Sequence, residues 1–174
     1  MFRKHFFNFC LKIGVVGALG FIAYFFVFYA LGVEACAKVY MNDFWIPSIF
    51  VILSLKFYRD KMNAGELRFW EGLSLGTFVV FWIVFIAAII IFLFVKFVDY
   101  SFFEQCIDSF RAYNLSIKKD VIDAHGKDAY EVATKEIEQI SLIGIVVKKF
   151  IMDFFISLIS VVIFSVFFLS LIHI

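Results

Sequence analysis

The chain has 174 residues, of which 64% are hydrophobic, 27 are Phe and only 18% are charged. A soluble domain carries about 25% charged residues and leaves roughly 30% of its chain surface in water, so a soluble fold cannot hide this much apolar surface. These values exclude a soluble enzyme and a disordered protein, and a net charge of +1 gives no field that attracts nucleic acid. We expect an all-α integral membrane protein.

The first apolar segment, residues 13–33, contains 21 residues without a charge. At about 1.5 Å per residue a helix of this length reaches roughly 31 Å, which matches the hydrocarbon core of a bilayer. Arg3, Lys4 and Lys12 precede it, as in a secretory signal, but a signal peptide has an apolar run of only about 7–15 residues. The sequence therefore predicts a first transmembrane helix that is retained.

The second apolar segment is short. Residues 44–55 are 12 uncharged residues, and the segment reaches 17 only when residues 39–43 are added. Asp43 suits the N-cap of a helix and Pro47 then falls near its first turn, where a missing N–H costs least. We expect a short span over residues 39–55, with a re-entrant segment as the alternative.

A charged loop over residues 56–71 follows, with a turn at residues 63–65. Three basic side chains flank the turn, namely Arg59, Lys61 and Arg68. They are candidates for binding the phosphate of an anionic lipid. The alternative is that they anchor the loop and form ion pairs with its acidic residues, which are Asp60, Glu66 and Glu71.

Two further spans are expected over residues 72–95 and 154–172. The interiors of the strong spans carry no ionisable residue, and Asp43 and Asp153 lie at span edges, where we expect them to cap helices. This argues against an ion channel or a proton-coupled transporter, because such proteins carry ionisable groups inside their spans. Small residues allow close contact between helices, and the candidates for helix packing are Gly14, Gly17, Gly72 and Gly76.

The polar connection over residues 96–149 predicts a helical hairpin. Ser101 and Glu104 have the spacing of a capping box, and Gly126 is a natural break. Four possible ligands follow each other in the hairpin, Asp123, His125, Asp128 and Glu131, but their spacing matches no standard metal site. We expect no metal and no cofactor. A disulfide between Cys36 and Cys106 is left open.

Lys and Arg density sets the orientation, because cytoplasmic loops are enriched in both. With four spans, residues 1–12 and 56–71 carry seven Lys and Arg in 28 residues, against nine in 68 for residues 34–43 and 96–153. The sequence predicts that both termini are cytoplasmic and that the hairpin is extracytoplasmic.

Several short elements resemble the family known as domain of unknown function 4199, small integral membrane proteins common in Bacteroidota. They are Lys12-Ile13-Gly14, Tyr58-Arg59-Asp60-Lys61, the run from Gly65 through Glu66, Leu67, Phe69, Glu71 and Gly72 to Gly76, Asp99, and His125-Gly126 with Ala129-Tyr130. Their order agrees over nearly the full chain, although Tyr100 stands where a Pro is expected. The resemblance implies four spans in a bacterial inner membrane and supplies no catalytic residues.

No enzyme signature is present: the chain lacks His-Glu-x-x-His, Gly-x-Ser-x-Gly and a Gly-rich phosphate loop. The leading hypothesis is a non-enzymatic accessory or scaffold subunit whose partners are membrane lipids and another membrane protein or a second copy. The alternative is binding or helping to translocate an anionic polyprenyl- or phospholipid. An enzyme that uses Asp123, His125 and Asp128 is the third reading.

Overall fold

The computed structural model describes residues 4–31, 43–63 and 65–170, and these contain helices and no strand. The all-helical class is therefore confirmed. The elements in chain order are α1 (Lys4–Ala30), α2 (Trp45–Phe57), the π-helix η2 (Tyr58–Met62), α3 (Phe69–Phe97), α4 (Ser101–Ser116), α5 (Lys118–His125), α6 (Lys127–Gln139) and α7 (Leu142–Ser170).

Three helices are long and apolar enough to cross a membrane: Phe6–Ala30, Phe69–Phe97 and Leu142–Phe168. They cover most of the first, third and fourth expected spans. The third of these helices differs most from expectation, because α7 begins at Leu142 and not near residue 154. The polar residues before 154 do not end the helix, since two of them turn inward and bond to each other.

The second expected span corresponds to a much shorter helix. Residues 39–42 lie outside the described residues, and α2 itself has 13 residues. Such a helix is about 20 Å long, less than the roughly 30 Å of a hydrocarbon core. The π-helix η2 extends it by five residues to Met62.

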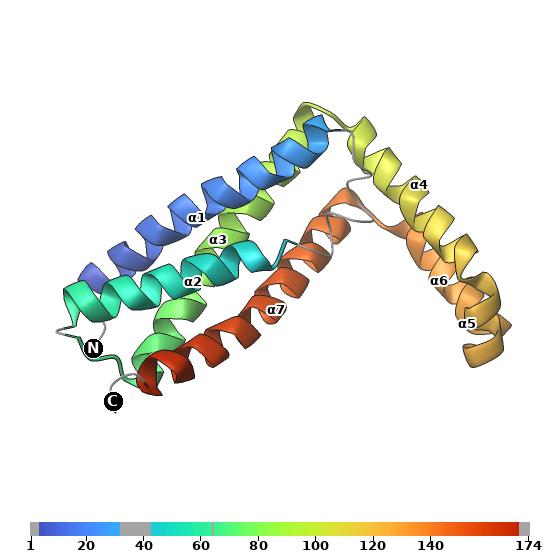
Figure 1. Cartoon of the computed structure of the whole chain (residues 1–174). Coiled ribbons are helices and arrows are strands. Elements are labelled where there is room, and N and C mark those ends of the chain that lie inside the picture. The colour runs from blue at the N-terminus through green and yellow to red at the C-terminus, as the bar shows by residue number, and fades with distance from the viewer. Residues whose placement is uncertain (1–3, 32–42, 64, 171–174) are drawn as a thin grey trace.

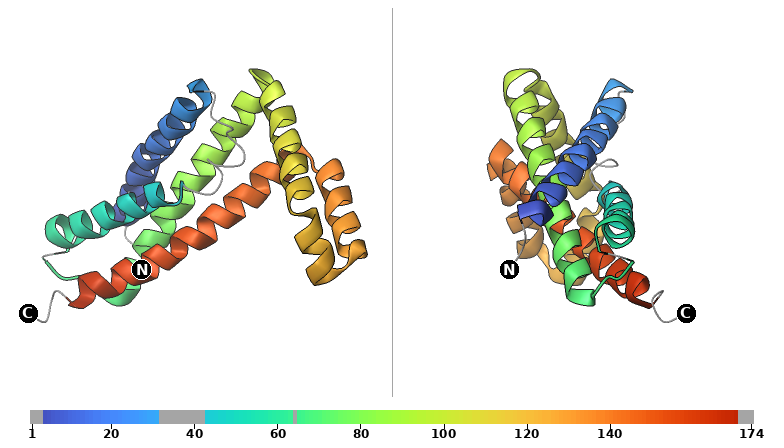
Figure 2. Two further views of the ribbon diagram at one scale, coloured as in Figure 1. Left: turned by 45° about the vertical axis from the view of Figure 1, so that its right-hand side comes forward. Right: turned by 90° about the vertical axis from the view of Figure 1, so that its left-hand side faces the viewer.

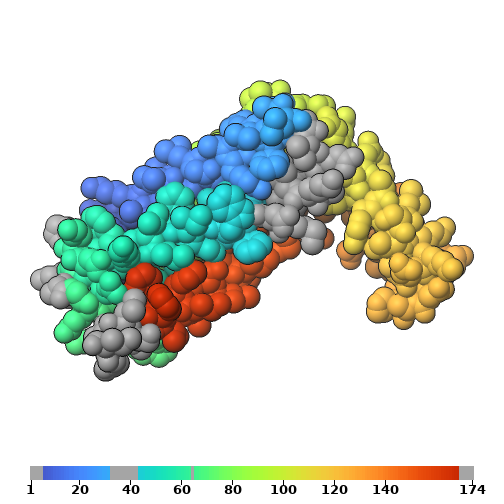
Figure 3. Space-filling view, viewed as in Figure 1, coloured from blue at the N-terminus to red at the C-terminus, as the bar shows by residue number. Residues whose placement is uncertain are grey.

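Helices α1, α2, α3 and α7 lie side by side in a bundle, and α4, α5 and α6 form a separate arm at one end of it (Figures 1 and 2). Helix α3 is central, with contacts to α1, α2 and α7. The start of α1 and the end of α7 lie at the end of the bundle away from the arm. The space-filling view shows the far part of the arm standing clear of the bundle (Figure 3).

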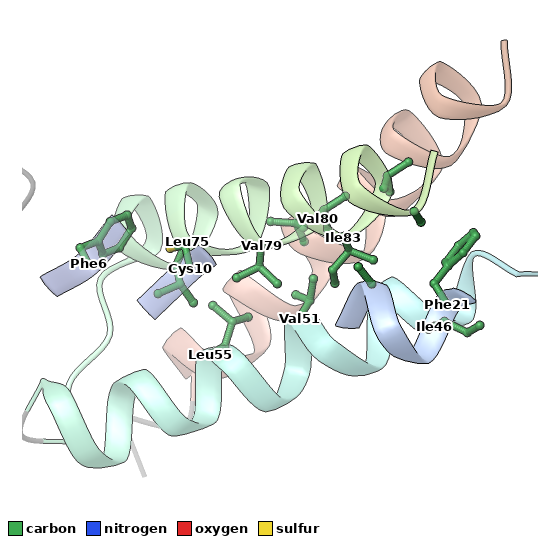
Figure 4. Packing of buried hydrophobic residues seen from close by; sticks show 14 of the residues in the cluster. Phe6, Cys10, Phe21, Ile46, Val51, Leu55, Leu75, Val79, Val80 and Ile83 are labelled. Carbon is green, nitrogen blue, oxygen red and sulfur yellow. The ribbon is translucent and has the colours of Figure 1, made fainter. Parts of the chain in front are cut away.

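The core of the bundle is aliphatic at its centre. Val51 and Leu55 of α2 meet Leu75, Val79 and Ile83 of α3, and all five side chains are fully buried (Figure 4). Burial of one such side chain contributes roughly 1.5–3 kcal/mol relative to water. In a membrane, where lipid replaces water, close packing contributes more than apolar transfer does.

The glycines expected at helix contacts lie between helices of this same chain. A Cβ on Gly14 would come within 2.4 Å of Trp82 Cβ, and one on Gly17 within 2.6 Å of an Ile83 methyl carbon. On the other side of α3, Gly72 lies against Ser165 and Gly76 against Val161, where an added Cβ would be 2.6 Å from a methyl carbon. The four glycines therefore let α1 and α7 approach α3.

In the arm α4 packs on α6, and α5 packs on α6 as well. The Asn114 amide donates a 3.0 Å hydrogen bond to Thr134 Oγ1 across the α4–α6 contact. Gly126, with a φ of 86°, makes the break between α5 and α6 that the sequence predicts. The expected capping box is absent, because α4 already includes Ser101, whose N–H and hydroxyl both donate to the Asp99 carboxylate.

Candidate functional site

An ion triad links α7 to the start of α2. The Lys149 ammonium lies 2.7 Å from both carboxylate oxygens of Asp43 and donates a second hydrogen bond, also 2.7 Å long, to Asp153 Oδ1. Asp43 and Asp153 are almost fully buried, at 3% and 2% exposure. Two carboxylates and one ammonium are thus held together inside the bundle, and we call these three residues the triad.

Local structure explains how the triad forms. Lys149 and Asp153 are four residues apart in α7, and this spacing places both on one side of the helix. Asp43 comes two residues before α2, and its carbonyl accepts a 3.1 Å hydrogen bond from the Ile46 N–H. This first turn holds Asp43 against α7. The expectation that Asp43 caps α2 is wrong, because its carboxylate binds Lys149 and α2 has no side-chain cap.

The triad lies between the middle of the bundle and its arm end, since Lys149 and Asp153 are seven and eleven residues from the first residue of α7. The rings of Phe150 and Phe154, each next in sequence to a triad residue, contact the ring of Phe81, and Phe150 also contacts Phe85. Phe81 is 12 residues from the first residue of α3 and Phe85 is 12 from its last, so each is about 18 Å from one end of the helix. Ionisable residues within a helix that could span a membrane are rare and generally functional.

This site was missed by the sequence reasoning, which placed Asp43 and Asp153 at span edges and no ionisable residue in the interior of a strong span. Lys149 and Asp153 both lie within the candidate span Leu142–Phe168. An apolar segment that is defined by hydropathy ends at its first charged residue. A helix, in contrast, continues past charged residues when their side chains have buried partners. The available signal was the four-residue spacing of Lys149 and Asp153 directly before an apolar run. This spacing predicts that both side chains lie on the same face of one helix.

A small cavity adjoins the triad. It lies between α1, α3, α4 and α7, and its volume is about 70 Å³. Its walls are otherwise apolar and rich in aromatic rings, with the charged groups of the triad at one place in the lining. Phe21 of α1 contributes to both features, since it lines the cavity and its ring centroid lies 5.8 Å from the Lys149 ammonium.

The charged loop over residues 56–71, which we call the basic loop, lies at the opposite end of the bundle from the arm, where α7 ends. Arg59 donates a 2.8 Å hydrogen bond from Nε to its neighbour Asp60, and its guanidinium lies 5.2 Å from the centroid of the Phe168 ring. Lys61 and Arg68 are exposed. Arg59 therefore has the ion pair that the alternative reading expects.

The turn of this loop is held by a side-chain network around Glu71. Asn63 donates from Nδ2 to Glu71 Oε2 at 3.1 Å and to the Glu66 carbonyl at 2.8 Å. The Arg68 N–H donates to the same Glu71 oxygen at 3.2 Å, at the start of α3. Gly65 has a φ of 86°, a conformation that favours glycine. The loop is thus an ordered turn with Lys61 and Arg68 on the outside and Arg59 partly buried against Phe168.

Residues 12–170 match the family described as "Protein of unknown function (DUF4199)". The chain belongs to this family. The resemblance drawn from the loop and hairpin motifs is therefore confirmed. No curated protein and no solved structure matches the chain.

The DUF4199 match extends over nearly all the helices, and it includes the triad, the basic loop and the arm. Its description assigns no activity. The long apolar helices and the composition are those of a membrane protein. What this DUF4199 member binds must therefore be argued from its own side chains.

Asp99 forms a second polar contact, between the end of α3 and α1. Its carboxylate accepts hydrogen bonds from Ser101 and, at 2.6 Å, from the Tyr29 hydroxyl. These bonds stabilise the ionised form, so they lower the pKa of Asp99 below its usual value, the Ser101 bond most. The contact joins two helices, and we interpret it as structural.

The polar residues of the arm were the other candidates for chemistry. Across the described residues, no three His, Cys, Asp or Glu side chains come close enough to hold a metal ion. His125 is the last residue of α5, and Asp128 is in the first turn of α6. Among the cysteines, Cys106 is disulfide-bonded and Cys10 is a buried free thiol, while Cys36 lies outside the described residues.

Proposed function

We propose that this DUF4199 protein is a non-enzymatic membrane protein that binds a small, largely apolar molecule in the cavity between α1, α3, α4 and α7. The observation that carries the proposal is the position of this cavity against the triad, inside the bundle and toward its arm end. Polar groups that converge on an apolar pocket characterise ligand sites, and ionisable groups inside a membrane mark sites of function.

The size of the cavity limits the ligand. A volume of about 70 Å³ is roughly half that of the 150 Å³ engineered cavity that holds benzene. The space fits a molecule of a few heavy atoms, or the end of a longer chain. A complete lipid would have to stay mostly outside it. The triad supplies groups that hold charge but no activated nucleophile, which supports binding without catalysis.

The test is photolabelling with a four-carbon alcohol that carries a diazirine, followed by mass spectrometry of the labelled peptides. In purified protein in lipid nanodiscs we expect adducts on residues that line the cavity. Ala88→Phe fills the cavity from α3 and should remove these adducts. Ala23→Phe places the same ring on an exposed part of α1 outside the cavity and should keep them. Adducts confined to outward-facing residues would contradict the proposal.

A second candidate function is binding of an anionic lipid headgroup at the basic loop. The exposed Lys61 and Arg68 at the end of the bundle support it, as does Arg59, which lies beside the last turns of α7. Arg59→Gln with Arg68→Gln should reduce bound anionic lipid in native mass spectrometry, and Lys at both positions should restore it only partly, because Lys lacks the bidentate fork. Equal lipid binding by all three proteins would leave the loop as an anchor.

The accessory or scaffold role stands as a further proposal. The four packing glycines face helices of this chain, so a partner would instead use an outward apolar face, such as the stripe of Phe155, Ile159 and Ile163 on α7. Such a stripe also suits lipid. Co-purification of one membrane protein at fixed stoichiometry, lost on Ile159→Trp, would support a scaffold, and recovery of lipids alone would oppose it.

For location we propose a bacterial inner membrane, with both termini cytoplasmic and the arm outside. The start of α1 and the end of α7 lie at one end of the bundle, together with the basic loop (Figure 1). An excess of Lys and Arg near this end agrees with the positive-inside rule.

A further inference from the structure

We propose that the cavity selects a small organic cation, namely a primary alkylammonium of about four carbons. This inference rests on the proposed function, since it specifies the ligand of the same cavity. It adds a requirement for charge: the carboxylates of Asp43 and Asp153 hold the ammonium of the ligand together with that of Lys149.

The first argument is a count of charges. With all three groups ionised, the triad has two negative charges and one positive, a net of −1. The other described residues that line the cavity are all uncharged. No other described residue of the lining offsets this net charge, and a net charge buried inside the bundle is costly. One more positive charge beside the carboxylates would balance the site, and an anionic ligand would double the imbalance.

The second argument is access. Asp43, Asp153 and Lys149 all contribute to the cavity wall, so a group in the cavity can reach the carboxylates without unfolding the helices. Primary ammonium groups donate up to three hydrogen bonds, and carboxylates accept several each. The triad already shows one ammonium held by both carboxylates at 2.7 Å. A ligand ammonium would use the same chemistry.

The third argument is the rest of the lining. Beyond the triad the walls are apolar, and they include the rings of Phe21, Phe25, Phe102 and Phe150. Aromatic faces attract cations and exclude water, and the Phe21 ring already lies near one ammonium. A metal ion would leave these apolar walls without a partner. An alkylammonium uses both the charged and the apolar part.

The test compares two photolabels of equal length, a four-carbon diazirine amine and the four-carbon diazirine alcohol, at pH 7 in nanodiscs. In the natural sequence we expect at least tenfold more cavity labelling by the amine at equal concentration. Butylammonium should protect against the amine label at lower concentration than butanol does, and Na⁺ at the same ionic strength should not protect.

Asp153→Asn leaves a balanced pair of Asp43 and Lys149, so the amine should lose its tenfold advantage while alcohol labelling persists. Asp108→Asn removes the same charge from an exposed residue of α4 and should leave the preference unchanged. Persistent alcohol labelling in Asp153→Asn also shows that this variant still folds.

The outcomes separate this inference from the proposed function. Equal cavity labelling by amine and alcohol would overturn the inference, because a bound proton would then balance the triad, and the proposed function would stand. Protection by Na⁺ would overturn it in favour of a metal cation. Absence of cavity labelling by both probes would reject the proposed function itself, and the inference with it.

Discussion

The Tyr29 hydroxyl donates a 2.6 Å hydrogen bond to the carboxylate of Asp99, which is 70 residues away in the chain. Around this bond the rings of Phe25, Phe94 and Phe102 pack on Tyr29. The end of α1 is thereby joined to the point where α3 passes into the arm. This contact has a measurable dependence on pH.

The folded protein lowers the pKa of Asp99, so the carboxylate contributes stability above the usual Asp pKa of about 3.9 and loses it as pH falls through the lower folded value. Tyr29→Phe removes one donor and should weaken the acid dependence of the melting temperature below about pH 4. Ser101→Ala should weaken it more, because the Ser101 bond has the larger effect. If the melting temperature fell equally with pH below about 4 in all three proteins, the result would contradict this account.

Lys149→Met should destabilise the bundle strongly. It leaves Asp43 and Asp153 buried beside each other without their ammonium, and breaking a buried ion pair in this way costs about 3–5 kcal/mol. Lys148→Met is the matched control, since Lys148 is the exposed neighbour. Adding Asp43→Asn and Asp153→Asn to Lys149→Met should restore most of the loss. Denaturation in mixed detergent micelles measures all four proteins.

Gly76→Ala should destabilise the contact between α3 and α7 by about 1–3 kcal/mol, because the new Cβ would lie 2.6 Å from a Val161 methyl carbon. Val161→Ala in the same chain removes that methyl carbon and should recover part of the loss. Gly20→Ala is the control, since a Cβ there has only ordinary contacts with Phe50. Equal melting temperatures for Gly76→Ala and Gly20→Ala would show that α3 and α7 are not this close.

A reporter that works only in the cytoplasm should be active when it is fused after Ile174. A reporter that works only outside the cytoplasm should be active when it is inserted at Gly126, the exposed break in the arm. The start of α1 and the end of α7 lie at the same end of the bundle, away from the arm, so the two reporters should respond in opposite ways. Activity of both reporters on one side would mean that the chain crosses the membrane an even number of times between Gly126 and Ile174, which would contradict a single crossing by α7.

Thiol labelling tests the compartment of the arm. Cys106 is disulfide-bonded and Cys10 is free, and disulfides persist mainly in oxidising compartments. We expect maleimide to modify one cysteine of the denatured, unreduced protein, three after reduction, and two in unreduced Cys106→Ser. Three reactive thiols before reduction would place the arm in a reducing compartment.

The long helices were predictable because an uncharged, apolar run of about 20 residues is typical of a transmembrane helix. The family was also predictable, since its motifs cluster in the loop around Gly65 and Glu71. The triad was not. Asp43 and Lys149 are 106 residues apart, and only the packing of α2 on α7 brings them together. Hydropathy scores every charged residue as polar, whether or not it has a buried partner. Asp153 was therefore placed at the edge of a span.

The packing glycines show the same limit. Their spacing indicates a close helix contact, but it does not say whether the neighbour belongs to the same chain. Gly76 proves to face Val161 of its own chain. The capping box at Ser101 was wrong for a local reason, because Asp99, two residues earlier, is an acceptor that both Ser101 donors reach.

Helix α2 presents a stripe of exposed apolar side chains at every fourth position, namely Trp45, Ile49, Leu53 and Phe57. This stripe is about 20 Å tall, whereas α3, with 29 residues, is about 43 Å long. The bundle therefore offers the bilayer two unequal hydrophobic heights. Lipid beside α2 must thin locally, at a cost of a fraction of a kcal/mol per Å of mismatch, while α3 must tilt to remain covered. Short-chain lipids would gather along one side of the protein, and its stability would follow the thickness of the membrane around it.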